Sequence, residues 1–312
     1  MKTCTDEEFM EAWRTHQSAV KVARALGISE RNIHARRRRI EARTGTDMPC
    51  ADKVTVAHSQ RLDLGILNGT IVVFSDAHFW PGLHSTAYRG LVRVIERLKP
   101  QAVINNGDSF DGASISRYPR IGWDKTPSVI EELKANEIAL GEIEDTAKKA
   151  RRNVSLVWCL GNHDARFENR LAANAPEFEQ VNGFRLKDHF PEWRPAWAAW
   201  NGQTVIKHRY KGGIHATHNN TLNSGASMVT GHLHSLKVTP FSDYNGTRFG
   251  VDTGTLADPR GPQFENYLED GPTNWRSGFA VLTYNDGRLM WPEVATVWDR
   301  KHIEFRGQLI EV

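Results

Sequence analysis

The sequence is poor in cysteine and contains no long apolar run. Its 312 residues include three cysteines, which lie far apart without C-x-x-C spacing, so we expect reduced thiols in a cytosol. The first residues turn acidic where an export signal would turn apolar, so no export is expected. No apolar stretch approaches the roughly 20 residues that span a bilayer. We therefore expect a cytoplasmic protein.

Nucleotide-binding motifs are also missing. The sequence contains neither the P-loop pattern G-x-x-x-x-G-K-[ST] nor the dinucleotide fingerprint, so ATP-driven and redox chemistry are unsupported. The net charge of +3 is too small to indicate nucleic acid, because solubility alone accounts for it. A hydrophobic content of 39% and a charged content of 25% describe an ordinary folded protein. The length permits one large domain with a small appendage.

Residues 5–44 have the composition of a small helical unit. Thr5 and Glu8 form a capping-box pattern before a first helix, and a second helix is predicted from Ser18. Gly27 supplies a turn residue before a third helix. The pattern around this glycine resembles the middle of helix-turn-helix DNA-binding units. We therefore predict a helix-turn-helix unit at 1–44, a linker at 45–60 and a main domain at 61–312.

The predicted third helix is dense in basic side chains. Guanidinium groups on a helix that enters the major groove supply phosphate contacts and guanine contacts. We therefore expect DNA as a partner, with contacts from Arg31, His34, Arg36, Arg37, Arg38 and Arg39. The alternatives are a solvated basic face and a protein-docking module.

Apolar runs alternate with helical patterns in the main domain. Buried strands are predicted at 71–74, 102–104 and 154–160, and helices at 88–98 and 128–151. The second half is richer in strands. This order predicts the α/β class, with mixed sheets covered by helices.

Five short segments rich in histidine and carboxylate occur along this domain, mostly directly after predicted strands. They are Asp76-Ala77-His78, Gly107-Asp108-Ser109-Phe110-Asp111, Gly161-Asn162-His163-Asp164, His208, and Gly231-His232-Leu233-His234. Residues i and i+2 that leave a strand can turn toward one point, so D-x-H and H-x-H each bring two donors together. Carboxylates and neutral imidazoles suit Mn, Fe or Zn, and one carboxylate can bridge two ions about 3.5–4 Å apart. The sequence therefore predicts a two-metal site for phosphate-ester hydrolysis.

In this order, the motifs resemble those of the calcineurin-like metallophosphoesterase superfamily over roughly residues 69–257. Together with the N-terminal unit they are similar to phosphoesterases of bacteriophage genomes. The resemblance implies a four-layer α/β/β/α sandwich with the metals at the strand ends. It further implies one ion held by Asp76, His78 and His234, a second held by Asn162, His208 and His232, and a bridge from Asp108.

Two residues are predicted to act beside the metals. His163 is not needed for coordination, so it is the candidate to contact the phosphoryl group and protonate the leaving oxygen. The resemblance suggests Asp111 as the carboxylate that orients His163. Alternatively, Asp111 caps a turn before Gly112, and Asp164 supports the metal ligands from behind.

His208 departs from the family pattern, in which glycine usually follows this histidine. Here residues 209–211 are Arg-Tyr-Lys. His208 is preferred as the ligand because it directly follows a strand-like run. His215 and His218 are the alternatives, either as ligand or as a contact to substrate.

The expected function is a dinuclear-metal-dependent phosphoester hydrolase. The leading hypothesis is a phosphodiesterase or nuclease that acts on DNA through a metal-bridging hydroxide, with Mn expected and Fe or Zn as alternatives. A second hypothesis is a phosphatase for phosphoproteins or small phosphoesters, although Gly112 stands where serine/threonine phosphatases usually carry arginine. A third is a non-catalytic DNA-binding regulator, which the intact set of donors argues against.

Overall fold

The computed structural model describes residues 4–16, 19–28, 33–46, 48, 61–117, 126–265, 271 and 273–312. The chain divides into two compact units, Met1–Ser59 and Gln60–Val312. Among the described residues, no helix is both long enough and apolar enough to cross a membrane.

The first unit contains the helices α1 (Asp6–His16), α2 (Ala19–Leu26) and α3 (Ile33–Thr44). The predicted capping box is present, because the Thr5 amide donates to Glu8 Oε2 at 2.7 Å and the Glu8 amide donates to Thr5 Oγ1 at 3.2 Å. Gly27 follows α2 with a φ of +67°, where glycine has no Cβ penalty. The helices share one small core of Phe9, Trp13, Val22, Ala23, Ile33, Ile40 and Met48. Ser18, the predicted start of the second helix, lies outside the described residues, and the helix-turn-helix assignment stays a prediction.

The second unit contains a nine-stranded mixed sheet with the strand order β15-β14-β13-β11-β2-β3-β4-β5 and β12 beside β11. Strands β2 to β5 run parallel, and β11 joins β2 in the antiparallel direction. The bounds are β2 (Gly69–Phe74), β3 (Ala102–Asn105), β4 (Ser155–Cys159), β5 (Arg194–Ala196), β11 (Gly278–Asn285), β12 (Arg288–Leu289), β13 (Glu293–Val297), β14 (His302–Phe305) and β15 (Gln308–Glu311).

A six-stranded sheet has the order β1-β6-β7-β8-β10-β9. Within it β7, β8 and β10 are parallel neighbours, and β9 pairs with β10 as a hairpin. The bounds are β1 (Arg61–Asp63), β6 (Ala198–Asn201), β7 (Thr204–Ile206), β8 (Ser227–Thr230), β9 (Lys237–Asp243) and β10 (Gly246–Asp252).

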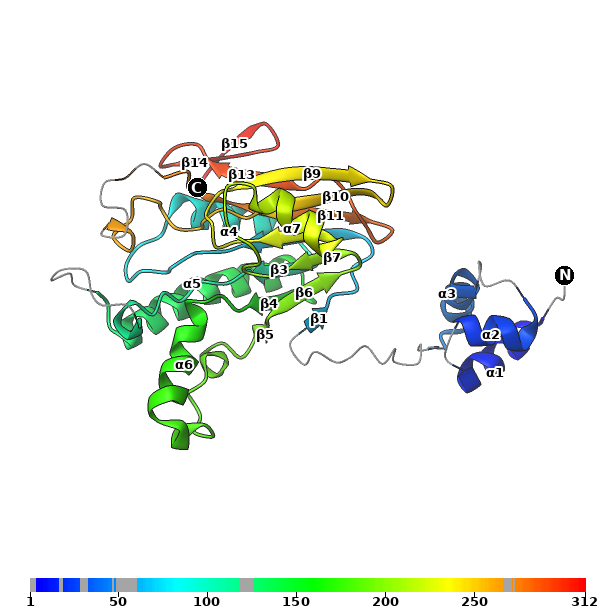
Figure 1. Ribbon diagram of the computed structural model, residues 1–312. Helices are drawn as coiled ribbons and strands as arrows, with labels where there is room; N and C mark the ends of the chain where they lie inside the picture. The colour runs from blue at the N-terminus through cyan, green and yellow to red at the C-terminus, as the bar shows by residue number, and fades with distance from the viewer. Residues whose placement is uncertain are drawn as a thin grey trace. The chain divides into compact units, whose positions relative to one another are not determined.

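Helices cover the outer faces of the two sheets (Figure 1). The large sheet packs on α4 (Thr86–Leu98) and α5 (Val129–Ala150), whereas α7 (Ala216–Ser224) lies on β8, β9 and β10. The remaining helical segments are α6 (Asp164–Asn174), η2 (Ala113–Ile115), η3 (Pro176–Phe178) and η4 (Leu186–His189). The helices predicted at 88–98 and 128–151 are therefore confirmed as α4 and α5.

The inner faces of the sheets form a continuous apolar layer. Val73 and Val157 of the large sheet are fully buried in one cluster with Ile206 and Val251 of the small sheet. The alternate residues of the large sheet, such as Val72, pack toward the helices instead, as the two-residue period of a strand requires. The order helix, sheet, sheet, helix confirms the predicted four-layer α/β/β/α sandwich.

Candidate metal centre

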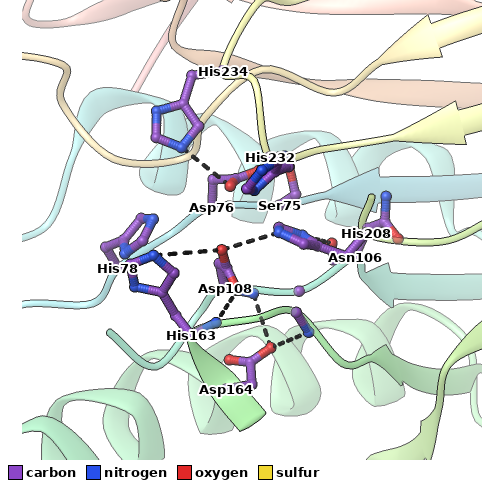
Figure 2. A network of polar contacts seen from close by, with 12 residues as sticks. Ser75, Asp76, His78, Asn106, Asp108, His163, Asp164, His208, His232 and His234 are labelled. Atoms are coloured by element: carbon purple, nitrogen blue, oxygen red, sulfur yellow. Dashed lines mark hydrogen bonds and ion pairs between the residues drawn. The ribbon is translucent and has the colours of Figure 1, made fainter. Parts of the chain in front are cut away.

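The five predicted segments converge at the carboxyl ends of strands from both sheets (Figure 2). The segments beginning at residues 76, 107 and 161 follow β2, β3 and β4, and those at 208 and 231 follow β7 and β8. Because these strands run parallel within each sheet, their exits meet at one edge of the sandwich. The topology therefore explains why distant segments share a site.

Three groups of side chains can each hold a metal ion, with ligand atoms within 4.8 Å of one another. One contains Asp76, His78 and His234, and another contains Asp108, His208 and His232. The first group contains the three residues predicted for one ion. The second contains His208 and His232, predicted for the other ion, together with Asp108, the predicted bridge. The third group contains His78, Asp111 and His163.

An unusual backbone conformation aims these side chains. Five predicted ligands have positive φ, namely Asp76 (+52°), His78 (+39°), Asp108 (+54°), His232 (+73°) and His234 (+54°). Asp and His tolerate the left-handed region better than most residues, yet each such residue costs on the order of 1 kcal/mol. In the D-x-H and H-x-H motifs, both donor residues therefore have a left-handed backbone, and this conformation brings their side chains to one point after the strand ends.

Glycines in the motifs permit close approach of the segments. A Cβ on Gly161 would collide with Asp108 Oδ1, and a Cβ on Gly231 would lie 2.5 Å from Asp76 Oδ2. Both contacts are far shorter than real Cβ contacts. The glycines of G-N-H-D and G-H-x-H are thus required by packing against the carboxylates of the other motifs.

Asp76 and Asp108 form the buried acidic centre of the cluster (Figure 2). Asp76 Oδ2 accepts the His232 amide at 2.8 Å, and its Oδ1 lies 3.1 Å from His234 Nε2. Burial raises the pKa of Asp76, but the charges of His234 and His208 outweigh it and lower the pKa to about 2. The pKa of Asp108 is likewise held far below its usual range, because His208 outweighs burial. Both groups are therefore carboxylates near neutral pH.

His208 is fixed in the orientation that a ligand needs. Its Nδ1 donates to the Asn106 carbonyl at 2.8 Å, and its Nε2 lies 3.0 Å from Asp108 Oδ2. Burial lowers the pKa of His208, yet the negative charges of Asp108 and Asp76 raise it to about 10. The alternatives His215 and His218 are both exposed, and His218 packs on Phe241. His208 is thus the residue that joins the cluster.

Two buried polar atoms of the cluster have no hydrogen-bond partner within the described chain, and they indicate whether the cluster suits metal ions. Asn162 Oδ1 and His234 Nδ1 are buried and make no hydrogen bond among the described residues. An amide oxygen and an imidazole nitrogen in this condition cost free energy unless something else binds them. Together with two buried carboxylates, they form a donor set that suits divalent ions.

Asp111 lies between two histidines. Its Oδ1 accepts from His163 Nδ1 at 2.7 Å and from His78 Nδ1 at 3.0 Å. Burial raises the pKa of Asp111, but the hydrogen bonds from the two histidines outweigh it and hold this pKa far below its usual range. Burial lowers the pKa of His163, but the hydrogen bond to Asp111 and the nearby negative charge outweigh it and raise this pKa. The expected contact between Asp111 and His163 is present, and the contact with His78 was not expected.

Arg166 of α6 contributes a guanidinium to this corner. Its NH1 donates to the Asp111 carbonyl at 3.0 Å, and its NH2 lies 3.2 Å from His163 Nε2. A Cβ on Gly112 would lie 3.3 Å from the stem of Arg166. The missing side chain at Gly112 therefore leaves room for an arginine from another element.

Asp164 holds the second and third motifs together. Its carboxylate accepts from the amides of Asp108 (2.8 Å), Phe110 (3.1 Å) and Gly161 (2.8 Å), and from the Trp158 indole (2.9 Å). Burial and the charge of Asp108 raise the pKa of Asp164. Asp164 is thus a structural clamp behind the cluster.

Two aromatic residues near the cluster gave no signal in the sequence. Trp275 packs on His234 with ring centres 4.4 Å apart, and Phe264 packs on His78 at 5.2 Å. Both belong to the long connection between β10 and β11, which has no metal-binding motif. Only the three-dimensional structure places them beside the predicted ligands.

Of the predicted DNA-contact arginines on α3, two pair with carboxylates of the unit and two pair with none that the structure describes. Arg36 pairs with Asp6 at 2.7 Å, and Arg37 lies 3.6 Å from Glu41, so both are engaged within the unit. Arg38 and Arg39 are exposed, and within the described part of the chain no carboxylate pairs with them. Arg31 and the side chain of His34 lie outside the described residues.

The fold and the site define a metallophosphoesterase, and comparison with known proteins agrees. Residues 69–251 match the calcineurin-like phosphoesterase family. The protein therefore belongs to this family, whose members hydrolyse phosphoester bonds with bound metal ions. This membership confirms the resemblance that the motifs carry.

Two bacteriophage proteins are similar to this chain. The Gene 54 protein of Mycobacterium phage L5 is 26% identical over 254 residues, which cover 73% of this chain and 93% of that protein. The Gene 54 protein of Mycobacterium phage D29 is 25% identical over 257 residues, with the same coverage. These relatives are consistent with a bacteriophage-type member of the family.

Proposed function

We propose that this hydrolase is a phosphodiesterase that cleaves DNA, with manganese as the preferred metal. The observation that carries the catalytic part is the pair of donor groups, Asp76-His78-His234 and Asp108-His208-His232, with His163 beside them. Oxygen and imidazole donors without thiolates suit Mn, Fe and Zn, and of these we propose Mn, with Fe and Zn as alternatives.

The residues around the cluster have separate tasks. The two donor groups would hold divalent ions, which would supply an acidified water molecule and positive charge for the nonbridging phosphoryl oxygens. Asp108 Oδ1 accepts the His163 amide at 2.8 Å and so fixes this residue at the edge of the cluster. Asp111 accepts from His163 Nδ1, so Nε2 is the nitrogen that would deliver a proton to the leaving oxygen. For this, Arg166 NH2, which lies 3.2 Å from Nε2, would turn from His163 to the phosphoryl group. Arg166 donates hydrogen bonds to the phosphoryl group.

The DNA part of the proposal is supported by the first unit. Arg38 and Arg39 present two guanidinium groups on the exposed face of α3, free of carboxylate partners within the described residues. Unpaired cations on a helix favour phosphate contacts. The proposed DNA surface is therefore centred on Arg38 and Arg39, since Arg36 and Arg37 have partners inside the unit.

A phosphatase for phosphoproteins or small phosphoesters is the second candidate. The same metal cluster can serve monoesters, and Arg166 beside His163 can bind the additional negative charge of a monoester. The two candidates differ in which ester is turned over faster.

Hydrolysis of bis(4-nitrophenyl) phosphate and of 4-nitrophenyl phosphate, each with added Mn, separates the two candidates. We expect the diester to have the larger kcat/KM, and we expect cleavage of single-stranded or double-stranded DNA. A strong preference for the monoester, together with intact DNA, would replace the diesterase by the phosphatase.

The DNA surface has its own test in the full-length protein. Arg38→Ala/Arg39→Ala should weaken DNA binding and reduce the magnitude of the slope of log K against log salt by about 1.4–1.8, since each of the two phosphate contacts contributes about 0.7–0.9. Turnover of bis(4-nitrophenyl) phosphate should not change. Lys21→Ala/Arg24→Ala on α2 removes the same charge from exposed positions and is the matched control. Unchanged DNA affinity in the α3 variant would make these helices a docking unit.

A further inference from the structure

A pocket lies beside the metal centre where the sequence departs from the family pattern. Residues 209–212 form one wall, and residues 230–233, which include His232, form the other. Its volume is about 240 Å³, which is enough for a phosphate group with part of a sugar. A group bound in this pocket would lie next to a group bound at the cluster.

The two walls are fixed by hydrogen bonds. The Gly231 amide donates to the His208 carbonyl at 2.8 Å, which joins one wall to the other. Asn220 of α7 is 1% exposed, and its Oδ1 accepts the Lys211 amide at 3.0 Å. Its Nδ2 donates back to the Lys211 carbonyl at 3.5 Å. The basic loop is therefore preformed rather than dependent on a ligand for its shape.

The charge on the pocket wall is not neutralised. Arg209 and Lys211 are exposed, and among the described residues neither pairs with a carboxylate. Elsewhere in this unit the exposed Arg306 does have a carboxylate partner, Glu293, at 2.6 Å. Of the residues that line the pocket, none is acidic. An anion is the ligand that this wall fits.

A second pocket, on the His78 side of the cluster, does not have this excess of positive charge. It has a volume of about 270 Å³, and Asp258 lines it together with Arg260. Its remaining lining is largely aromatic and aliphatic, with Phe79 and Trp80 among the residues. Of these two pockets, the one on the side of His232 has the excess of positive charge.

We propose that the pocket at residues 209–212 and 230–233 binds the phosphate next to the scissile phosphodiester of a nucleic-acid strand. Arg209 supplies two parallel hydrogen bonds to that phosphate, and Lys211 supplies a point charge. This inference rests on the proposed diesterase function and deepens it. It identifies the feature that makes a strand a better substrate than an isolated ester.

Matched esters with and without a second phosphate provide the test. The substrates are thymidine 3′-(4-nitrophenyl phosphate) with and without a 5′-phosphate, and thymidine 5′-(4-nitrophenyl phosphate) with and without a 3′-phosphate. Release of 4-nitrophenolate reports only the diester. In the wild type with Mn, the added phosphate should raise kcat/KM about tenfold in at least one pair, mainly through KM, as expected for charge-assisted hydrogen bonds.

Substitution of the two cations should remove that advantage. In Arg209→Ala/Lys211→Ala the ratio within each pair should fall to about 1, while the esters without the second phosphate keep their turnover. Arg209→Lys/Lys211→Arg should retain most of the ratio. The control Arg288→Ala/Lys301→Ala removes two exposed cations that do not line the pocket and should leave the ratio unchanged.

The possible failures are distinguishable. If the diesters are hydrolysed but the added phosphate changes kcat/KM equally in the wild type and in Arg209→Ala/Lys211→Ala, the pocket assignment is wrong and the diesterase stands. If no diester is hydrolysed while 4-nitrophenyl phosphate is, the diesterase proposal is wrong and the pocket assignment falls with it.

Discussion

The metal centre and helix α3 both concentrate charged side chains, but the two regions use them in opposite ways. In the centre, Asp76 and Asp108 are 0% and 1% exposed and face several imidazoles. On α3, Arg36 and Arg37 are occupied by Asp6 and Glu41 of their own unit. One region gathers donors around a common point, and the other satisfies much of its charge internally.

The difference between the two regions shows which sequence patterns indicate a site: a motif that contains glycine indicates more than a run of arginines does. The glycines of the G-N-H-D and G-H-x-H motifs indicate close approach to another segment, because only a residue without a Cβ fits there. A run of arginines implies only positive charge, which a single nearby acid can neutralise, as Asp6 does for Arg36 and Arg43. Substitutions in the two regions should therefore have effects of very different size.

Asp108→Asn should have the largest effect. It removes the negative charge of the group Asp108-His208-His232. If the new amide oxygen keeps the hydrogen bond from the His163 amide, the new amide nitrogen would face His208 Nε2, which lies 3.0 Å from Asp108 Oδ2. We expect kcat to fall by about 10³-fold or more, since metal-assisted stabilisation is worth several kcal/mol. Kinetics with Mn and metal content by mass spectrometry measure both consequences. Asp145→Asn, at an exposed position of α5, is the control, and equal activity in the two variants would contradict the role of Asp108.

His163→Ala should reduce kcat while metal remains bound. Removal of a general acid costs about 10²–10⁴-fold, and the loss should be greater for an alkyl ester than for a 4-nitrophenyl ester, whose leaving group needs no proton. Metal content measured beside both rates provides the check. An equal loss for the two esters would mean that His163 positions the substrate rather than protonates it.

Gly231→Ala tests the close approach inside the centre. The new Cβ would lie 2.5 Å from Asp76 Oδ2, so we expect a loss of about 1–3 kcal/mol in unfolding free energy, as for other overpacked sites, together with weak activity. Gly141→Ala is the matched control, because it lies in α5 with nothing within 4 Å of the added Cβ. That variant should be stabilised by about 0.5–1 kcal/mol. Denaturant unfolding measures both, and similar stabilities would show that the centre can relax.

The regular elements of the main domain follow from local patterns. The run at 71–74 is apolar throughout because β2 is covered on both faces, by α4 and α5 on one side and by the second sheet on the other. The helix predicted at 128–151 is α5, and Ser128 and Glu131 form its capping box. These features depend on neighbours in the sequence, so the sequence alone is sufficient to predict them.

Features that depend on tertiary approach could not be predicted in the same way. Asp111 contacts His78 as well as His163, and Arg166 reaches both Asp111 and His163 from α6. Trp275 lies against His234 only because the connection after β10 folds back over the centre. None of these contacts has a fixed spacing in the sequence. On α3, the pairing of Arg36 with Asp6 joins residues 30 positions apart, and no pattern of one helix reveals it.

The smallest effect is expected for Asp6→Asn in the first unit. Hydrogen bonds from Arg36, followed by those from Arg43, lower the pKa of Asp6 below its usual 3.8. A lowered pKa in the folded state means that the ion pair stabilises the unit above pH 3.8 and that this contribution is lost as pH falls below it. Hydrogen exchange of α1 and α3 amides in the full-length protein should therefore be faster in Asp6→Asn than in the wild type at pH 7, and the difference should shrink toward pH 3. Glu11→Gln, in a pair with Arg14 whose side chains are 71% and 66% exposed, should change exchange less. A larger effect from Glu11→Gln would show that the exposed pair, and not the bridge between α1 and α3, stabilises the unit.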